Sequence, residues 1–276
     1  MKVYISIDAE GCSGIFKLAH VCSEHRDYDF CRRMMEGDAN AAIRGAYDAG
    51  ATEVLVCDAH DNSDNIRIEN LDPRARLISG GATPLSMMEG ITGDFDAALL
   101  LGYHSRKGER GSIAHTYSFS SIREVRINGR PVSEAEISGY LAGHFGVPVV
   151  FLSGDQYITE HMRSAVPGLR TVTTKRAIGC SAAECVHPTA TWKQIQEEVS
   201  AALAPLVTDP IKPMGDAPYT IEIDFGSTSR ANLAMRLPGA YLAAPATTRY
   251  RAEDYMTIYN AFLCMVTLSS SFSERK

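Results

Sequence analysis

The chain has 276 residues, 45% of them hydrophobic and 22% charged, which is typical of a globular protein with a sizeable core. A net charge of -6 argues against a nucleic-acid partner, and no segment offers the roughly twenty apolar residues of a membrane span. The seven cysteines are odd in number and form no CxxC pair, which favours a reducing, cytoplasmic location over a disulfide framework.

Short apolar runs alternate with longer helical patterns along the first two hundred residues, which predicts a mostly parallel sheet flanked by helices. In chain order we expect strands at Val3–Ile7, Val54–Cys57, Arg76–Ser79, Ala97–Leu101, Glu124–Ile127 and Val147–Leu152. We expect helices at Tyr28–Ala49, from Ser133 to about Phe145, and at Asp155–Ala165 and Pro188–Ala204.

Local signals support several of these boundaries. Gly50 is placed to cap the first long helix in a left-handed conformation. Asn128 and Gly129 are typical of a tight turn after a strand. Ser133 and Glu136 have the spacing of a capping box, so a helix is expected to begin at Ser133.

The segment Val207–Pro218 contains three prolines and a glycine, which indicates a linker or the edge of a subdomain. Beyond it, Tyr219–Phe225 alternates like a strand and Ala252–Leu268 is expected to be a closing helix. The sequence therefore predicts an α/β domain over residues 1–206. A smaller α+β portion over residues 207–276 is expected to pack on that domain and to contribute to oligomer contacts.

Charged and imidazole side chains follow three of the expected strands. The first strand is followed by Asp8 and Glu10, the second by His60 and the fourth by His104. Ligands of open parallel sheets bind beyond the carboxyl ends of the strands, so these side chains are expected to meet at one edge. Carboxylates held close together repel, and a carboxylate–imidazole set suits zinc or manganese. These four residues therefore predict a metal site.

Each residue also has a simpler interpretation. A single aspartate at a strand end is usually a cap or a turn residue, and Asp58 and Asp61 need be no more than that. His115 follows a glycine-flanked loop and by itself fits a solvated imidazole. Glu134 and Glu136 begin a helix, where negative side chains favour the helix dipole. Only the convergence of four residues at three strand ends favours a metal site.

The chain also resembles the zinc-dependent D-aminopeptidases, a metallopeptidase family named for the dipeptide-operon enzyme of bacilli. Ser6–Gly11 matches the Ser-x-Asp-x-Glu-Gly signature of that family. The similarity continues across nearly the whole of the first two hundred residues and is looser beyond them. It is carried further by Glu53–His60, Leu77–Gly80, Met88–Gly90, Leu100–His104, His115, Ile127–Glu134 and Ala142–Pro148. Ala9 and the residues that flank His115 depart from the pattern without removing a ligand.

The resemblance implies a set of roles at these positions. It makes His115 the catalytic histidine and implies two zinc ions per chain, with Asp8 bridging them. The metal ligands that it implies are Asp8, Glu10, His60, His104 and Glu134. It also implies a homo-oligomer, a ring-like decamer that shelters its active sites.

The expected activity is hydrolysis of the N-terminal peptide bond of short peptides, with a preference for D-residues that rests on the resemblance alone. The nearest enzymatic alternatives are a two-metal phosphoesterase, for which Arg106, Lys107 and Arg110 offer cationic groups, and another amidohydrolase. The non-enzymatic alternative is a metal-containing protein that binds peptides without turnover.

Overall fold

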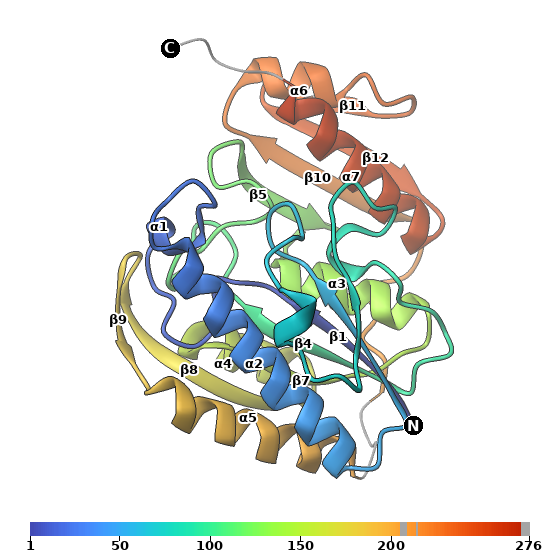
Figure 1. Cartoon of the computed structure of the whole chain (residues 1–276). Coiled ribbons are helices and arrows are strands. Elements are labelled where there is room, and N and C mark those ends of the chain that lie inside the picture. The colour runs from blue at the N-terminus through green and yellow to red at the C-terminus, as the bar shows by residue number, and fades with distance from the viewer. Residues whose placement is uncertain (205–208, 214, 272–276) are drawn as a thin grey trace.

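The computed structural model describes residues 1–204, 209–213 and 215–271, which build two sheets (Figure 1). The larger sheet has seven strands in the order β3-β2-β1-β4-β7-β8-β9, all parallel to their neighbours except β9. This confirms the expected α/β class. The strands are β1 (Lys2–Ile7), β2 (Glu53–Asp58), β3 (Arg76–Ile78), β4 (Ala97–Tyr103), β7 (Val149–Asp155), β8 (Arg170–Gly179) and β9 (Ala182–Cys185).

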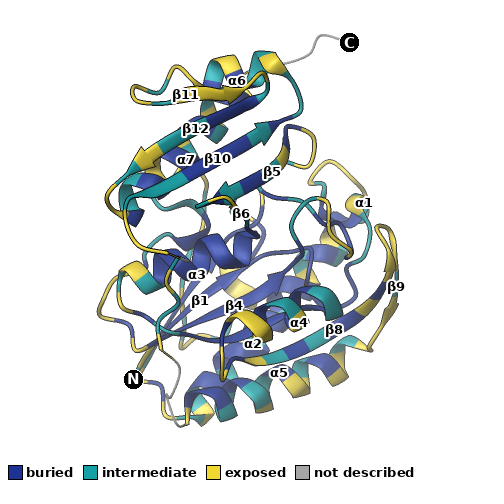
Figure 2. Ribbon diagram, turned by 180° about the vertical axis from the view of Figure 1, so that it is seen from behind, coloured by how far each residue is buried: buried dark blue, intermediate teal, exposed yellow. Residues whose placement is uncertain are grey.

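Helices cover both faces of this sheet, which explains why its central strands are apolar almost throughout (Figure 2). Alternate side chains of one strand enter different cores, as Ile5 and Tyr4 of β1 do. One core includes α2 (Tyr28–Asp48) and α5 (Pro188–Leu203), and the other includes α3 (Glu134–His144) and α4 (Gln156–Ala165). Short turns of helix lie at α1 (Leu18–Val21), η1 (Ile68–Asn70) and η2 (Ser86–Met88).

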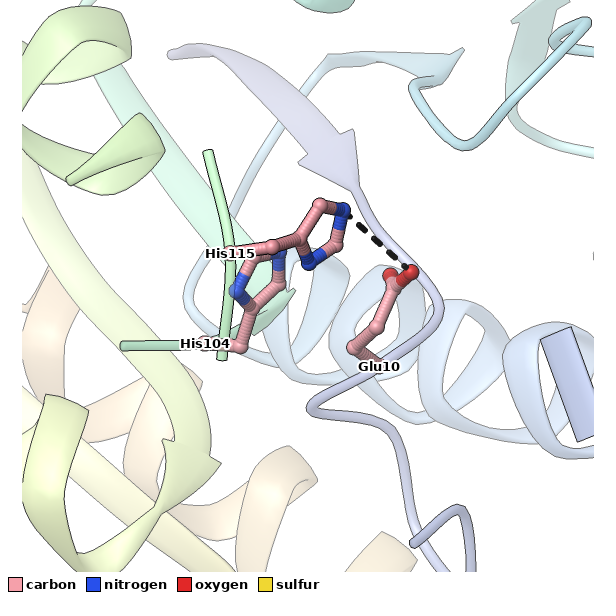
Figure 3. A group of neighbouring side chains, drawn as sticks. All are labelled: Glu10, His104 and His115. Atoms are coloured by element: carbon pink, nitrogen blue, oxygen red, sulfur yellow. Dashed lines mark ion pairs between the residues drawn. The ribbon is translucent and has the colours of Figure 1, made fainter. Parts of the chain in front are cut away.

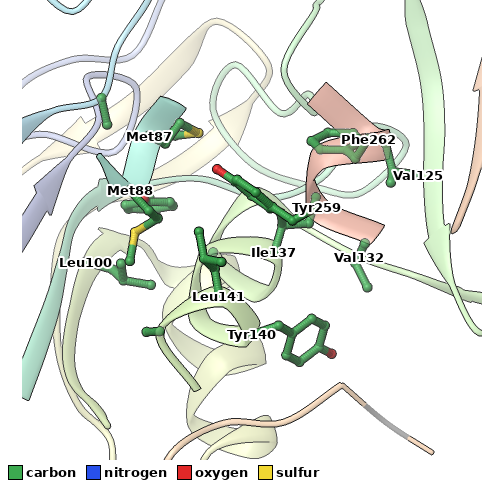
Figure 4. Close-up of a cluster of buried hydrophobic side chains, with 14 of the residues drawn as sticks. Met87, Met88, Leu100, Val125, Val132, Ile137, Tyr140, Leu141, Tyr259 and Phe262 are labelled. Atoms are coloured by element: carbon green, nitrogen blue, oxygen red, sulfur yellow. The ribbon is translucent and has the colours of Figure 1, made fainter. Parts of the chain in front are cut away.

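A second, antiparallel sheet has the strand order β11-β12-β10-β5-β6. Its strands β5 (Ile122–Ile127) and β6 (Arg130–Pro131) precede residue 207, whereas β10 (Tyr219–Phe225), β11 (Tyr241–Ala244) and β12 (Thr247–Ala252) follow it. The helices α6 (Thr228–Ala234) and α7 (Tyr255–Ser270) pack on this sheet, and α7 also contacts α3 through a buried apolar cluster (Figure 4). Since the second sheet draws on both sides of position 207, the division into residues 1–206 and 207–276 stays a prediction.

The predicted caps and turn are confirmed. Gly50 has φ +90 directly after α2, and Asn128 and Gly129 have positive φ values between β5 and β6. Ser133 and Glu136 form a reciprocal capping box at the start of α3. Positions 207, 208 and 214 of the predicted linker lie outside the described residues. In the part of the chain that is described, no helix combines the length and the apolarity needed to cross a membrane.

The structure corrects the expected start of the closing helix. Residues up to Ala252 belong to β12, and α7 begins only at Tyr255 because Asp254 caps it by accepting from Thr257 N at 2.8 Å. The hairpin of β8 and β9 falls in a stretch for which the sequence predicted no element. Strand β8 is rich in polar side chains, and β9 has only four residues, so neither shows a clear hydrophobic alternation in the sequence.

Candidate metal centre

The carboxyl ends of β1, β2 and β4 lie side by side, as the sequence predicts. Ile7 at the end of β1 is in register with Asp58 on β2 and with Leu101 on β4. The residues that follow these strands therefore start from the same edge of the sheet. This placement brings together Asp8, Glu10, His60 and His104, all of them buried.

The backbone after β1 is held against the end of β4. Asp8 N donates to Leu101 O at 2.9 Å, and Gly11 N donates to Gly102 O at 2.7 Å. Gly102 has φ +67, and a Cβ atom there would lie 2.0 Å from Asp8 O, so only glycine allows this approach. The close crossing fixes where the Asp8 and Glu10 side chains begin.

A first cluster is formed by Asp8, Glu10 and His60. His60 Nδ1 lies 3.3 Å from Asp8 Oδ1 and 3.2 Å from Glu10 Oε2. The opposite ring nitrogen, Nε2, donates to Val21 O at 2.9 Å. A backbone acceptor of this kind fixes the tautomer of a metal-ligating histidine, so the lone pair of neutral His60 points at the two carboxylates.

A second cluster is formed by Asp8, His104 and Glu134. His104 Nε2 lies 3.3 Å from Asp8 Oδ2 and 3.5 Å from Glu134 Oε1, while its Nδ1 donates to Ser105 O at 3.0 Å. Glu134 enters from the first turn of α3. The two oxygens of Asp8 thus face different clusters, and this one carboxylate is common to both.

His115 lies against the second cluster (Figure 3). Its ring stacks on that of His104 with centroids 4.4 Å apart and an angle of 2° between the planes. His115 Nδ1 donates to Ile113 O at 2.9 Å, so Nε2 is the free nitrogen, and it lies 4.0 Å from Glu10 Oε1. Burial and the neighbouring His104 lower the pKa of His115 to about 4. The imidazole is therefore neutral at pH 7.

The pKa values of the carboxyl groups diverge within the site. Burial raises the pKa of Glu134 to about 7 against the opposing effect of His104. Burial also raises the pKa of Glu10, but nearby histidines, His60 first, outweigh it and hold that pKa well below its usual range. A bound cation would favour the ionised form of both groups.

Three atoms test whether these residues fit a metal ion. Asp8 Oδ2, Glu10 Oε2 and His104 Nε2 are buried and have no hydrogen-bond partner among the described residues. Buried polar atoms are normally satisfied, and within each cluster the potential ligand atoms lie within 4.8 Å of one another. Carboxylate oxygen and imidazole nitrogen are ligands that zinc accepts. The residues therefore fit a divalent metal ion.

The residues of the two clusters, except His104, line a cleft with a volume of about 520 Å³. Leu18, Val21 and Met87 give it an apolar wall, and Glu24 and Asp61 add further carboxylates. The cleft thus offers apolar surface beside a concentration of negative charge, an environment suited to a small ligand with a cationic end.

Several candidates from the sequence lie elsewhere or have structural roles. Asp58 is buried and accepts from Asn65 and Ile66, so it shapes the loop after β2. Glu136 belongs to the capping box and faces His161 at 3.2 Å. Close to the site, the Cys12 thiol is buried and donates to Asp8 O at 2.9 Å, so it holds the backbone of that residue.

The basic residues near His104 do not serve the cleft. Arg106 pairs with Glu109 at 2.8 Å, and Lys107 donates to Phe119 O at 2.7 Å. Neither they nor Arg110 are among the described residues that line the cleft. The described residues that line the cleft thus include no lysine or arginine, the side chains with which a phosphoesterase usually binds phosphate.

Sequence reasoning missed Tyr117, which lines the cleft. Its backbone N donates to Glu134 Oε1 at 2.6 Å, and its φ of +56 is unusual for a residue with a large side chain. The carbonyl groups of Val21, Ser105 and Ile113, which orient the three histidines, were missed as well. Backbone groups of loops leave no signal in the sequence.

The sequence and the fold of this chain are similar to those of known proteins. The profile of a family described as D-aminopeptidase matches residues 1–264. A D-aminopeptidase of Bacillus subtilis (strain 168) is 36% identical over 272 residues, which cover 98% of each chain. A solved structure, described as the Zn-dependent D-aminopeptidase DppA from Bacillus subtilis, a self-compartmentalizing protease, is 35% identical. It superposes with a TM-score of 0.95 over the whole of both chains.

Proposed function

This chain belongs to the D-aminopeptidase family, and on that premise we propose that it hydrolyses the N-terminal peptide bond of short peptides, preferring D-residues. The reaction takes place in the cleft at the carboxyl ends of β1, β2 and β4, at a site for two zinc ions. The relatives support the activity and the D-preference, and one of them is described as zinc-dependent.

The observation that carries the proposal is the pair of clusters that share Asp8. Each cluster combines carboxylates with a histidine whose second nitrogen is already bonded to a backbone carbonyl. In this proposal both clusters would hold zinc, and Asp8, which is common to them, would contribute to both sites. The proposed ligands are Asp8, Glu10, His60, His104 and Glu134.

His115 is the proposed catalytic group of the protein itself. When bound, zinc ions supply Lewis acidity and lower the pKa of a water molecule towards about 7. The Ile113 carbonyl keeps a proton on Nδ1 of His115, so neutral Nε2 is free to take up a proton. Protonated there, His115 stabilises negative charge on the substrate oxygen or donates a proton to the leaving amine.

A free N-terminus is recognised by charge. The cleft contains carboxylates of Glu10 and Glu134 beyond the shared Asp8, and one of these two holds the substrate ammonium in this proposal. The apolar wall of Leu18 and Val21 is available to the side chain of the first residue.

The family relationship also suggests an assembly and a location. The relative of known structure is described as self-compartmentalizing, so we infer that this chain forms a homo-oligomer, a ring-like decamer with sheltered sites. Exposed apolar side chains at Ile178, Tyr241 and Leu242 are consistent with contacts between copies. All seven cysteines are free, which supports a reducing, cytoplasmic location.

The test is release of free amino acid from D-Ala-D-Ala and from L-Ala-L-Ala by the zinc-loaded protein, with and without a chelator. D-selective release that the chelator abolishes is the expected result. Equal or L-selective release would remove the stereochemical assignment. Peptide binding without release would favour a binding protein, and turnover of phosphate esters alone would favour a phosphoesterase.

A further inference from the structure

A set of buried polar side chains holds the loop that directly follows Glu10. Thr174 Oγ1 donates to Gly11 O at 2.7 Å, and Lys175 Nζ donates to Cys12 O at 2.9 Å. The Asp38 carboxylate accepts from the backbone N of Ser13 at 3.0 Å and from the Ser13 hydroxyl at 2.6 Å. We call Thr174, Lys175 and Asp38 the loop cradle.

An irregularity in β8 makes the cradle possible. Thr173 is paired with Gly154 and Lys175 with Asp155, so Thr174 is an extra residue in β8 at this step of the pairing. Successive side chains of a regular strand point to opposite faces, whereas the buried Thr174 and Lys175 both reach the loop after Glu10, at Gly11 O and Cys12 O. The bulge therefore turns two consecutive side chains towards the interior, a feature common beside active sites.

The cradle carries charges that are costly to bury. Lys175 is enclosed completely, and burial lowers the pKa of its ammonium group. Asp38 is 0% exposed, and burial raises the pKa of its carboxyl group, although Trp192 Nε1 also donates to it at 2.8 Å. A core of apolar residues would avoid these costs, so the polar groups have a purpose other than packing.

The loop joins the cradle to the ligand residues by short links. Cys12 N donates to Ala9 O at 3.0 Å, and the Cys12 thiol donates to Asp8 O at 2.9 Å. A displacement of Cys12 would therefore move the backbone of Asp8 and, through the intervening turn, that of Glu10. No cradle residue is itself in the cleft.

We propose that Thr174, Lys175 and Asp38 are positioning residues that hold Asp8 and Glu10 in their zinc-binding geometry before the metal arrives. The inference rests on the proposed function only in taking the cleft to be a zinc site. A cradle formed in advance raises zinc affinity, because the ordering of the ligand loop is then part of folding and not of binding.

The experiment compares Thr174→Val and Lys175→Met with Thr173→Val in the full-length protein. Thr173 neighbours the cradle on the same strand, but its hydroxyl faces Thr159 at 3.2 Å, which makes its replacement the matched control. Zinc affinity is measured by competition with a chromophoric chelator, and thermal unfolding of each zinc-free protein is measured in parallel. Valine preserves the shape of threonine, so Thr174→Val keeps the test valid even if Lys175→Met does not fold.

Loss of a group that supports metal ligands typically costs about 10–100-fold in affinity. We expect a loss in that range for both cradle variants relative to Thr173→Val, with Thr174→Val still folded at the temperature of the binding assay. Zinc affinity equal to that of the control in Thr174→Val would overturn the proposal. Wild-type protein that binds zinc but cleaves no peptide would overturn the proposed function alone, and protein that binds no zinc would overturn both.

Discussion

Buried carboxylates in two regions of this molecule have different kinds of partner. In the second sheet, Glu222 is held by two guanidinium groups, with Arg126 Nε at 3.0 Å and Arg249 Nε at 2.6 Å. In the metal centre, the ion pairs found among the described residues join Asp8, Glu10 and Glu134 only to histidines. Glu222 is paired with guanidinium groups that are always charged, whereas the carboxylates of the metal centre are paired only with imidazoles, which carry a positive charge only when they are protonated.

This difference indicates that the carboxylates of the metal centre, unlike Glu222, need a bound cation. A buried carboxylate is stable when it is paired and hydrogen-bonded, and Glu222 meets both conditions. Asp8 Oδ2 and Glu10 Oε2 have no hydrogen-bond partner among the described residues, so their cluster is incomplete without an added positive charge. Burial of acidic residues alone does not identify a metal site, but burial without a permanent cation does favour one.

The largest expected effect is a loss of peptide hydrolysis when the Asp8 carboxylate is changed to an amide, with the same change at Glu222 as the control. Asp8→Asn keeps the oxygen that accepts from Ala9 N at 2.8 Å but removes the charge shared by the two clusters. Enzymes accelerate reactions by at least about 10⁶-fold, and most of that gain would be lost, so peptide hydrolysis should fall by more than about 10⁴-fold. Glu222→Gln makes the same chemical change in the other region and should keep wild-type activity. Equal losses of peptide hydrolysis in Asp8→Asn and Glu222→Gln would contradict the distinction drawn between the two regions.

His115→Ala tests the proposed catalytic histidine separately from the ligands. Loss of a general acid or base typically costs about 10²–10⁴-fold in turnover, so kcat should fall by that factor. Because the variant retains the five proposed ligands, its zinc content should equal that of the wild type. Near-normal kcat, or a loss of zinc in parallel with activity, would show that His115 does not have this role.

Zinc should stabilise the fold through the incomplete cluster. A ligand that binds only the native state adds about 2.7 kcal/mol per site to the free energy of unfolding when its free concentration is 100 times Kd. Urea denaturation with and without zinc should show this increase in wild-type protein and in Glu222→Gln, and not in Asp8→Asn. An equal increase in Asp8→Asn would mean that zinc stabilises the chain somewhere else.

The smallest expected effect is a change in the free energy of unfolding when Glu222 loses its charge beside Arg126 and Arg249. Burial raises the pKa of Glu222, but hydrogen bonds from Arg126 and Arg249 outweigh it and lower that pKa below its usual value. Ionised Glu222 therefore contributes its full stabilisation of the fold at pH values above its pKa in the unfolded chain, which is about 4.3. This contribution is lost as the pH falls through the lower pKa that Glu222 has in the folded protein. Glu222→Gln should reduce the free energy of unfolding by about 1–2 kcal/mol at pH 7. A difference from wild type that persists undiminished at pH 3 would contradict this assignment.

The sequence predicted the part of the site that depends on regular structure. Asp8, His60 and His104 follow buried parallel strands, and the ends of such strands coincide wherever the sheet forms. Glu134 is different, because the helix dipole explains it and Glu136 equally well. Only the family resemblance distinguished the two, and in the structure Glu136 completes the capping box while Glu134 faces His104.

Features that depend on irregular backbone conformation could not be predicted from the sequence. His115 is oriented by its hydrogen bond to Ile113 O, and Ile113 has a φ of +54, a conformation that a β-branched residue rarely adopts and that the sequence does not indicate. A buried Lys175 contradicts the usual preference of lysine for the surface, and the bulge that buries it arises from the pairing of β7 with β8. Such features are set by tertiary contacts and not by local pattern.

The most direct test of the central claim is the number of zinc ions bound by the purified wild-type chain after zinc loading and removal of free metal. The two clusters that share Asp8 predict about two ions per chain by elemental analysis, in the manner of two-metal hydrolases. A chain that retains no zinc under these conditions would contradict the claim that its strand-end carboxylates form a metal centre.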